Sequence, residues 1–112
     1  MLKTVQETDR LTVIEIQAGV LDASNSQQFR EAVTPMLHSN TIVLLDLSGV
    51  EFVDSSGLGA LLSCLRRLNE VQGDLQLCSL APPVRYVLQL ARVHKIIDIF
   101  NDRDEALRAA RS

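Results

Sequence analysis

The sequence lacks several features that would point to common classes of protein. Its two cysteines, Cys64 and Cys78, lie singly within apolar segments, with no Cys-x-x-Cys or Cys-x-x-His grouping that would hold a metal. We expect both to be small, reduced core residues and predict no metal site. No window approaches the ~20 apolar residues needed to cross a bilayer, and the N-terminus has no apolar run of signal-peptide length. These absences favour a cytoplasmic protein with no direct membrane insertion.

Concentrated charge and catalytic motifs are also missing. The 11 Lys and Arg are scattered among 14 Asp and Glu, so nucleic acid is not an expected partner. There is no Gly-x-Ser-x-Gly elbow and no phosphate-binding loop ending in Gly-Lys-Ser/Thr. Nothing in the sequence places His38 or His94 against a serine. We therefore predict that the chain is not an enzyme, and nucleotide binding has no support.

What is present is a regular alternation of strand-like and helix-like segments. With 112 residues, 46% of them hydrophobic, the chain can build one core, and we expect a single domain spanning residues 1–112. Strands are expected at 4–6, 11–17, 41–47, 75–78 and 96–100. The first two should form a hairpin, and 41–47, which is almost continuously apolar, should be the central strand. The alternation predicts an α/β fold with a mixed or largely parallel sheet.

The expected helices have distinct start signals. Ser24, with Gln27 three residues later, is typical of an N-cap with a capping-box partner. Pro35 should bend or loosen the end of that first helix. Pro83 suits the first position of a third helix, and Asp102 with Glu105 should open the last one. In the second helix an apolar face is expected from the leucines at 58, 61, 62, 65 and 68.

The stretch from Asp46 to Gly59 is the most informative part of the chain. A buried strand passes into an acidic loop and then into a helix opened by Ser55, Ser56 and Gly57. The first-turn amides of a helix lack internal partners and carry about half a positive charge, so a phosphate on either serine would be stabilised there. The serines could equally be helix caps. A division of labour is plausible, with Ser56 as the cap and Ser55 reachable by a kinase.

The neighbouring residues also have structural alternatives. Asp54 could stabilise the helix through its dipole or contact a partner. Gly57 and Gly59 each cost about 1 kcal/mol of helix stability relative to alanine, which indicates close approach by another chain. Asp22 could simply end a strand and begin a turn. Asp46 ends a buried strand, where a carboxylate needs hydrogen bonds from loop amides, so we interpret it as organising the loop.

Three of these segments together resemble the STAS domain family, whose best-known members are bacterial anti-sigma factor antagonists. They are Gly19-Val20-Leu21-Asp22, Asp46-Leu47-Ser48 and Phe52-Val53-Asp54-Ser55-Ser56-Gly57-Leu58-Gly59. The similarity spans nearly the whole chain. It implies a STAS-like α/β fold, with a mixed sheet of four to five strands and about four helices packed on it.

The resemblance also implies a function. In this family an unphosphorylated antagonist binds an anti-sigma factor that is also a serine kinase, and phosphorylation of the antagonist releases it. By position, Ser55 matches the phosphorylated serine, with Ser56 as the alternative. Partner contacts are expected from Asp22, Asp54, Ser56, Gly57, Leu58 and Gly59. A serine phosphatase would restore the hydroxyl.

The resemblance leaves some alternatives open. The kinase's ATP and magnesium belong to the partner, so no cofactor is assigned to this chain. An adaptor subunit of a membrane transporter complex, or of another signalling cascade, is the alternative function. Whether the domain self-associates is left open.

Overall fold

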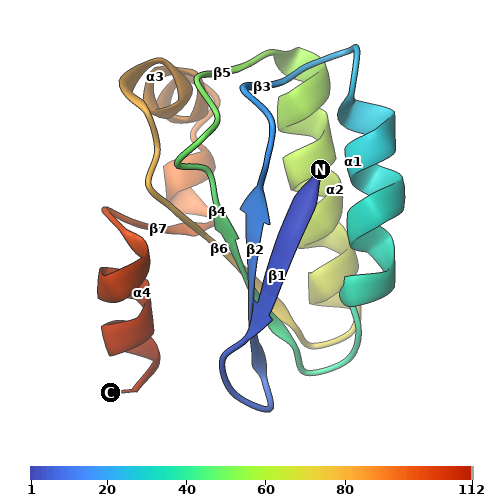
Figure 1. Ribbon diagram of the computed structural model, residues 1–112, viewed down its shortest axis with the longest axis vertical. Helices are drawn as coiled ribbons and strands as arrows, with labels where there is room; N and C mark the ends of the chain where they lie inside the picture. The colour runs from blue at the N-terminus through green and yellow to red at the C-terminus, as the bar shows by residue number, and fades with distance from the viewer. Residues whose placement is uncertain (112) are drawn as a thin grey trace.

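A five-stranded mixed sheet forms the centre of the computed structural model, which describes residues 1–111 (Figure 1). Its strands are β1 (Leu2–Gln6), β2 (Leu11–Ile16), β4 (Ile42–Asp46), β6 (Asp74–Cys78) and β7 (Asp98–Phe100). They lie in the order β1-β2-β4-β6-β7, with β1 antiparallel to β2 and the other pairs parallel. The predicted hairpin and the central position of the 41–47 strand are confirmed.

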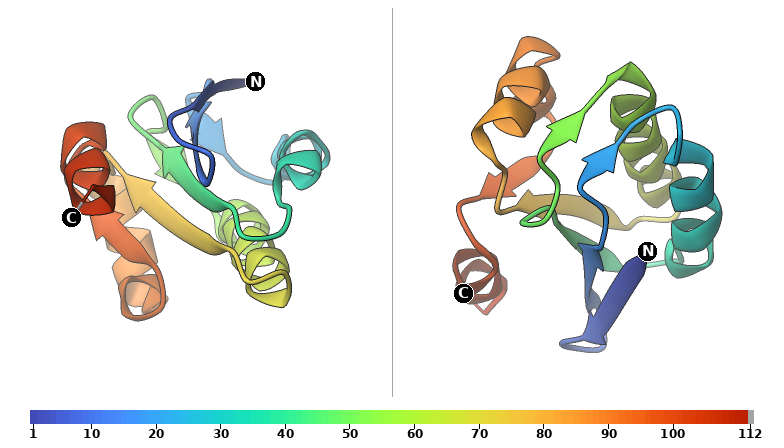
Figure 2. Two further views of the ribbon diagram at one scale, coloured as in Figure 1. Left: turned by 90° about the horizontal axis from the view of Figure 1, so that it is seen from below. Right: turned by 45° about the horizontal axis from the view of Figure 1, so that its top comes forward.

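Helices cover both faces of this sheet (Figures 1 and 2). They are α1 (Ser26–Val33), α2 (Ser55–Glu70), α3 (Pro82–Leu90) and α4 (Arg103–Ala110), with short 3₁₀ turns η1 (Thr34–Met36) and η2 (Val93–Lys95). The larger core cluster joins α1, α2 and α3 to one face, and a smaller cluster joins α4 to the other.

Strand β4 shows why the sheet needs two covers. Val43 and Leu45 belong to the larger cluster, whereas Leu44 belongs to the smaller one under α4. Because successive side chains of a strand point to opposite faces, a strand covered on both sides is apolar throughout. Asp46 points to the α4 face, where it meets Arg103.

A second, two-stranded parallel sheet lies beyond the carboxyl ends of the main strands. It pairs β3 (Val20–Leu21) with β5 (Phe52–Val53), and the sequence did not predict it. Two residues per strand are too few to show a period. Strand β5 leads directly into α2, so this small sheet fixes where α2 begins.

Several expected helix details are corrected. Ser24 does not cap α1, because its amide and hydroxyl donate to Asp22; Asn25 holds the N-cap position without a side-chain cap bond. The capping box with Gln27 is therefore absent. Pro82, one residue earlier than expected, is the first residue of α3. The loosening at Pro35 is confirmed, since α1 ends at Val33 and passes into a 3₁₀ turn.

Two further expectations need adjustment. The buried face of α2 contains two of the predicted leucines, Leu61 and Leu68, together with the smaller residues Gly57, Ala60 and Cys64. The other leucines of the pattern are only partly buried. The last strand is shorter than 96–100, because the amides of Ile96 and Ile97 donate to the Val93 carbonyl of the preceding 3₁₀ turn and not to β6.

Candidate functional site

The N-terminus of α2 is tied to the loop after β3 by one carboxylate. Asp54 is the N-cap residue, and its Oδ1 accepts a hydrogen bond from the Gly57 amide at 2.9 Å. Its Oδ2 accepts from the Ala23 amide at 3.1 Å, across 31 positions of sequence. The expectation that Ser56 is the cap is therefore wrong. Asp54 has the position and the two acceptor oxygens to join both segments.

The same bonds hold Asp54 in its charged form. The Gly57 amide, and secondarily the Ala23 amide, stabilise the carboxylate and lower its pKa below the ordinary value of 3.8. A fixed negative charge therefore lies immediately before the two serines at neutral pH.

With Asp54 as the cap, both serines keep free hydroxyls. Ser55 is the first residue of α2 and is exposed, whereas Ser56 is partly buried. Within residues 1–111, neither hydroxyl makes a hydrogen bond. Ser55 is thus accessible to another protein, and its hydroxyl has no role in holding the fold.

Asp22 organises the loop after β3, to which Asp54 is hydrogen-bonded through the Ala23 amide. Its Oδ1 accepts from the Ser24 amide at 3.0 Å and from the Ser24 hydroxyl at 2.5 Å. Its own amide donates to Oδ1 of Asn25 at 2.9 Å. Asp22 is half-buried, and it lies beside Ala23, so the two acidic loops are adjacent.

The two glycines of α2 differ. A Cβ on Gly57 would lie 2.0 Å from the carbonyl oxygen of Leu21, a distance that no real side chain tolerates. The close approach at Gly57 is thus made by the chain's own β3, which corrects the interpretation given above. At Gly59 the nearest atom is the Arg30 guanidinium at 3.3 Å, the far end of a flexible side chain.

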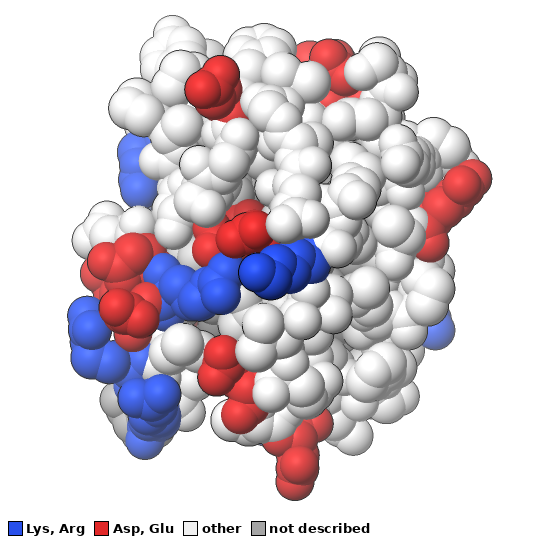
Figure 3. Space-filling model, viewed as in Figure 1, with Lys and Arg blue, Asp and Glu red and all other residues white. Residues whose placement is uncertain are grey.

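Apolar side chains that sequence reasoning missed lie beside the serines. Phe52 is 47% exposed and Val20 is 37% exposed, and the two are paired across the small sheet. Their neighbours Leu21 and Val53 are buried, so this alternation is the signal that marks one face of the small sheet as open. On the side seen in Figure 3, the surface over β3 and β5 is largely uncharged with isolated acidic groups, whereas most Lys and Arg lie lower.

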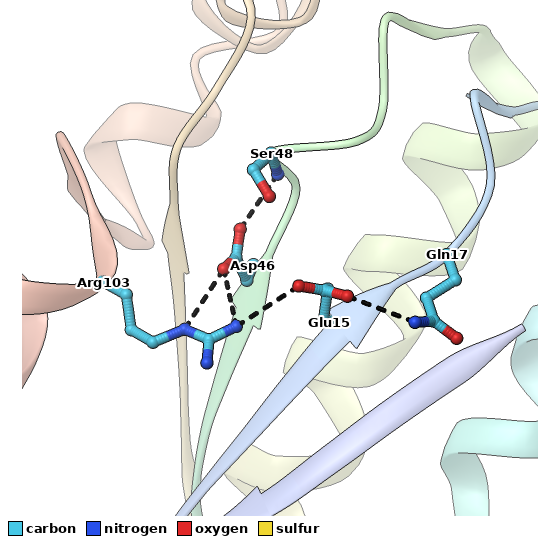
Figure 4. A network of polar contacts seen from close by, with 5 residues as sticks. All are labelled: Glu15, Gln17, Asp46, Ser48 and Arg103. Atoms are coloured by element: carbon cyan, nitrogen blue, oxygen red, sulfur yellow. Dashed lines mark hydrogen bonds and ion pairs between the residues drawn. The ribbon is translucent and has the colours of Figure 1, made fainter.

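The Asp46 loop is held by a polar network that reaches α4 (Figure 4). Asp46 accepts from the Ser48 amide at 2.9 Å and from Nε and an Nη of Arg103 at 3.2 and 2.8 Å. Glu15 of β2 lies 3.6 Å from the same guanidinium. Burial alone would raise the pKa of Asp46, but the Ser48 amide and Arg103 outweigh it and hold the pKa below 3.8. The predicted loop-organising role is confirmed, while the partner Arg103 was not foreseen.

In the described part of the chain, no cluster of three or more His, Cys, Asp or Glu side chains could hold a metal ion. None of the described helices has the length and apolar character needed to cross a membrane.

The fold and the position of the serine turn define the class of protein. A mixed sheet with helices on both faces, and a serine-opened helix beyond a short parallel strand pair, is the architecture of a STAS-type α/β domain. Residues 3–106 match the model of the STAS domain, and the chain belongs to that family.

Individual relatives agree. The chain is 31% identical over 110 residues to BtrV, a candidate anti-sigma factor antagonist of Bordetella bronchiseptica, covering 97% of this chain and 94% of BtrV. The structure of an anti-sigma factor antagonist (STAS) domain protein from Planctomyces limnophilus has a TM-score of 0.89 and 28% identity, covering 99% and 98% of the two chains. The anti-sigma factor antagonist SpoIIAA in its unphosphorylated form has a TM-score of 0.81 and 26% identity, covering 99% and 96%.

Proposed function

We propose that this protein is an anti-sigma factor antagonist switched by phosphorylation of Ser55. In the unphosphorylated state it binds an anti-sigma factor that is also a serine kinase, and phosphorylation releases that partner. A separate serine phosphatase returns the protein to its binding state. The chain itself acts as a binding module and has no enzymatic activity.

The observation that carries the proposal is the division of roles between Asp54 and Ser55. Asp54 supplies the cap and the bond to the neighbouring loop, so the serine beside it is exposed and has an unbonded hydroxyl. A kinase needs such a hydroxyl, since it must reach the oxygen without breaking the fold. Family membership and the likeness to SpoIIAA support the role of an antagonist, and the choice of Ser55 rests on its position and exposure.

The partner surface that we propose surrounds this serine. Phe52 and Val20 provide exposed apolar area on one side, and Leu58 and Gly59 continue it along α2. Buried aromatic anchors ringed by polar groups supply most of the binding energy in many interfaces. Asp54, Asp22 and Ser56 form the polar edge, while Gly57 contributes by letting α2 lie against β3.

Phosphorylation would act on this surface through charge. A phosphoserine adds about 1.5 to 2 negative charges at neutral pH. It would stand next to the ionised Asp54, at the edge of an apolar surface that a partner must desolvate. Introducing such a group into an interface weakens binding by repulsion and by desolvation cost.

The test uses the cognate anti-sigma kinase and three variants. Ser55→Ala should bind the kinase in the presence of ATP as tightly as in its absence, because it cannot be modified. Ser55→Asp should bind more weakly, and the control Ser56→Ala should still be phosphorylated and released. Binding is measured by calorimetry, and the modified residue by mass spectrometry. Phosphate on Ser56 alone, or release of Ser55→Ala by ATP, would refute the assignment of Ser55.

A further inference from the structure

A cavity of about 210 Å³ opens between α1 and α2, away from the serine turn. Its floor is apolar, because the lining residues Val33, Leu37 and Cys64 are each at least 96% buried. Arg30 is half-buried and Arg67 is exposed, and both line the cavity. An Nη of Arg30 lies 3.3 Å from where a Cβ on Gly59 would stand.

The size of the cavity limits what can enter. An apolar protein cavity of about 150 Å³ accommodates benzene. A cavity of 210 Å³ therefore has room for one six-membered ring, or a short alkyl chain, with a small polar head group. It is too small for a nucleotide, since sites for larger ligands occupy about 300–1,000 Å³.

Among the described residues of the lining, the two arginines are the side chains left to donate to an anion. The hydroxyls of Thr34 and Ser63 already donate to the carbonyl oxygens of Arg30 and Gly59 at 2.6 and 2.9 Å. Among residues 1–111, no acidic side chain lines the cavity. Arg67 lies 3.7 Å from the exposed Glu70, whereas within residues 1–111 the Arg30 guanidinium has no hydrogen bond or ion pair.

The thiol at the floor adds apolar surface and no charge. Burial raises the pKa of Cys64 to about 12, with the nearby charge of Arg30 acting in the opposite direction. Cys64 therefore remains a neutral thiol at physiological pH. The cavity thus has an uncharged floor. Within the described residues, the guanidinium of Arg30 in its lining has no ion-pair partner.

We propose that this cavity binds a small amphipathic carboxylate. The ring or short chain of the ligand packs on Val33, Leu37 and Cys64, and its carboxylate pairs with Arg30. A guanidinium is suited to this task because it presents parallel donors that match the two oxygens of a carboxylate. Ser63 is eight positions after Ser55, or roughly 12 Å along α2, so the floor of the site lies apart from the proposed phosphorylation site. The Arg30 guanidinium adjoins Gly59, so that end of the site borders the proposed partner surface.

Benzoate is the probe, with benzyl alcohol as a neutral ligand of similar size. Amide chemical shifts of the full chain are recorded during titration with each compound. Benzoate should shift the amides around Val33, Leu37 and Cys64 in a saturable manner, and benzyl alcohol should bind about tenfold more weakly. The proposal would be overturned if these amides showed no saturable shifts up to about 20 mM benzoate. A Kd of about 20 mM corresponds to a binding free energy of about −2.3 kcal/mol.

Matched variants test the role of Arg30. Arg30→Gln should weaken benzoate binding about tenfold or more, while Arg30→Lys should retain part of the affinity. The control Arg66→Gln removes the same charge from an exposed position of α2 that does not line the cavity, and it should bind like the original chain. Equal losses in Arg30→Gln and Arg66→Gln would show that only net charge matters and would contradict the proposed site.

Discussion

At the residue scale, the first turns of α2 contain two glycines that the sequence cannot distinguish. Both lower helix propensity by a similar amount, so the pattern indicates only that something approaches closely. The structure separates them, because the space at Gly57 is filled by the Leu21 carbonyl and the space at Gly59 borders a mobile guanidinium. Which atom lies next to the Cα of a glycine depends on tertiary packing, which the local sequence does not determine.

This difference predicts opposite effects on stability. Gly57→Ala should lower the free energy of unfolding by about 3 kcal/mol or more, because the added Cβ would lie 2.0 Å from a backbone oxygen. Gly59→Ala should change it little or raise it by up to about 1 kcal/mol, since the end of the Arg30 side chain can move and helix propensity improves. Urea denaturation of both variants measures the two values. Equal effects would contradict the packing described here.

Asp54 allows a second prediction, about the cap. Asp54→Ala removes both acceptors and should lower the melting temperature clearly, whereas Asp54→Asn retains an oxygen acceptor and should lower it less. Hydrogen exchange should localise the loss to the Ala23 and Gly57 amides. If both variants had the melting temperature of the original chain, the hydrogen bonds from the Gly57 and Ala23 amides to Asp54 would contribute nothing to stability.

The two cysteines allow a third prediction. Burial raises the thiol pKa of Cys64 to about 12 and that of Cys78 to about 11, and both are enclosed in the core. Because the thiolate is the reacting form, the folded protein should react with a thiol reagent too large for the α1–α2 cavity, at pH 8, only as fast as it opens. Denatured protein should react at once at both sites. Rapid reaction of either thiol in the folded state would show that its burial is wrong.

At the element scale, sequence reasoning succeeded where a segment is long and periodic. The strands 11–17 and 41–47, the serine-opened helix and the Asp102 cap of the last helix all appear within a few residues of their expected places. It failed at the small β3–β5 sheet and at Ser24. The strands of the small sheet have two residues each, which is too few to show a period. Ser24 bonds to Asp22 instead of capping α1, and the shape of that loop depends on its contact with α2.

The link between α4 and the sheet was also beyond sequence reasoning, because Arg103 and Asp46 are 57 positions apart. Arg103→Met should lower the free energy of unfolding by about 1–3 kcal/mol, less than for a fully buried pair because the Arg103 side chain is 32% exposed. The exposed Arg111 of the same segment serves as the control in Arg111→Met. Chemical denaturation compares the two, and equal stability of both variants would contradict the role of the network.

The same network sets an acid dependence. The folded-state pKa of Asp46 lies below its ordinary value of 3.8, so its charged form contributes stability above that value. This contribution is lost as the pH falls through the lowered, folded-state pKa. Arg103→Met removes one cause of the shift, so the variant should lose less stability than the original chain between about pH 5 and pH 2. Denaturation midpoints across this range test the sign.

At the scale of the whole molecule, the hydrophobic core is separate from the side chains proposed to meet a partner, although Asp54 both caps α2 and borders the proposed surface. The core lies on the two faces of the main sheet, and α4 is held from the side of the sheet opposite to α2. Ser55, Phe52 and Val20 lie at the outer edge, on segments that follow the strands. A change of charge at that edge can therefore alter binding without disturbing the packing.

That separation leads to a last prediction, about the phosphorylated protein. A phosphate on Ser55 is stabilised by the positive end of the α2 dipole, by roughly 0.3–1 kcal/mol. The negative charge of Asp54, at short range, repels the phosphate. The two effects oppose each other, so the free energy of unfolding should change by less than about 1 kcal/mol. In the proposed complex with an anti-sigma kinase, the phosphate adds a desolvation cost that the free protein does not have, and affinity should fall by about a hundredfold or more, corresponding to about 2.7 kcal/mol.

Salt then separates the causes of the lost affinity. Raising ionic strength from about 0.1 M to about 1 M shortens the screening length from about 10 to 3 Å. If repulsion dominates, the affinity difference between the two forms should shrink over this range. A salt-independent difference with unchanged stability would instead assign the effect to steric exclusion around Phe52 and Gly59. A large loss of stability on phosphorylation would refute the separation of fold and switch.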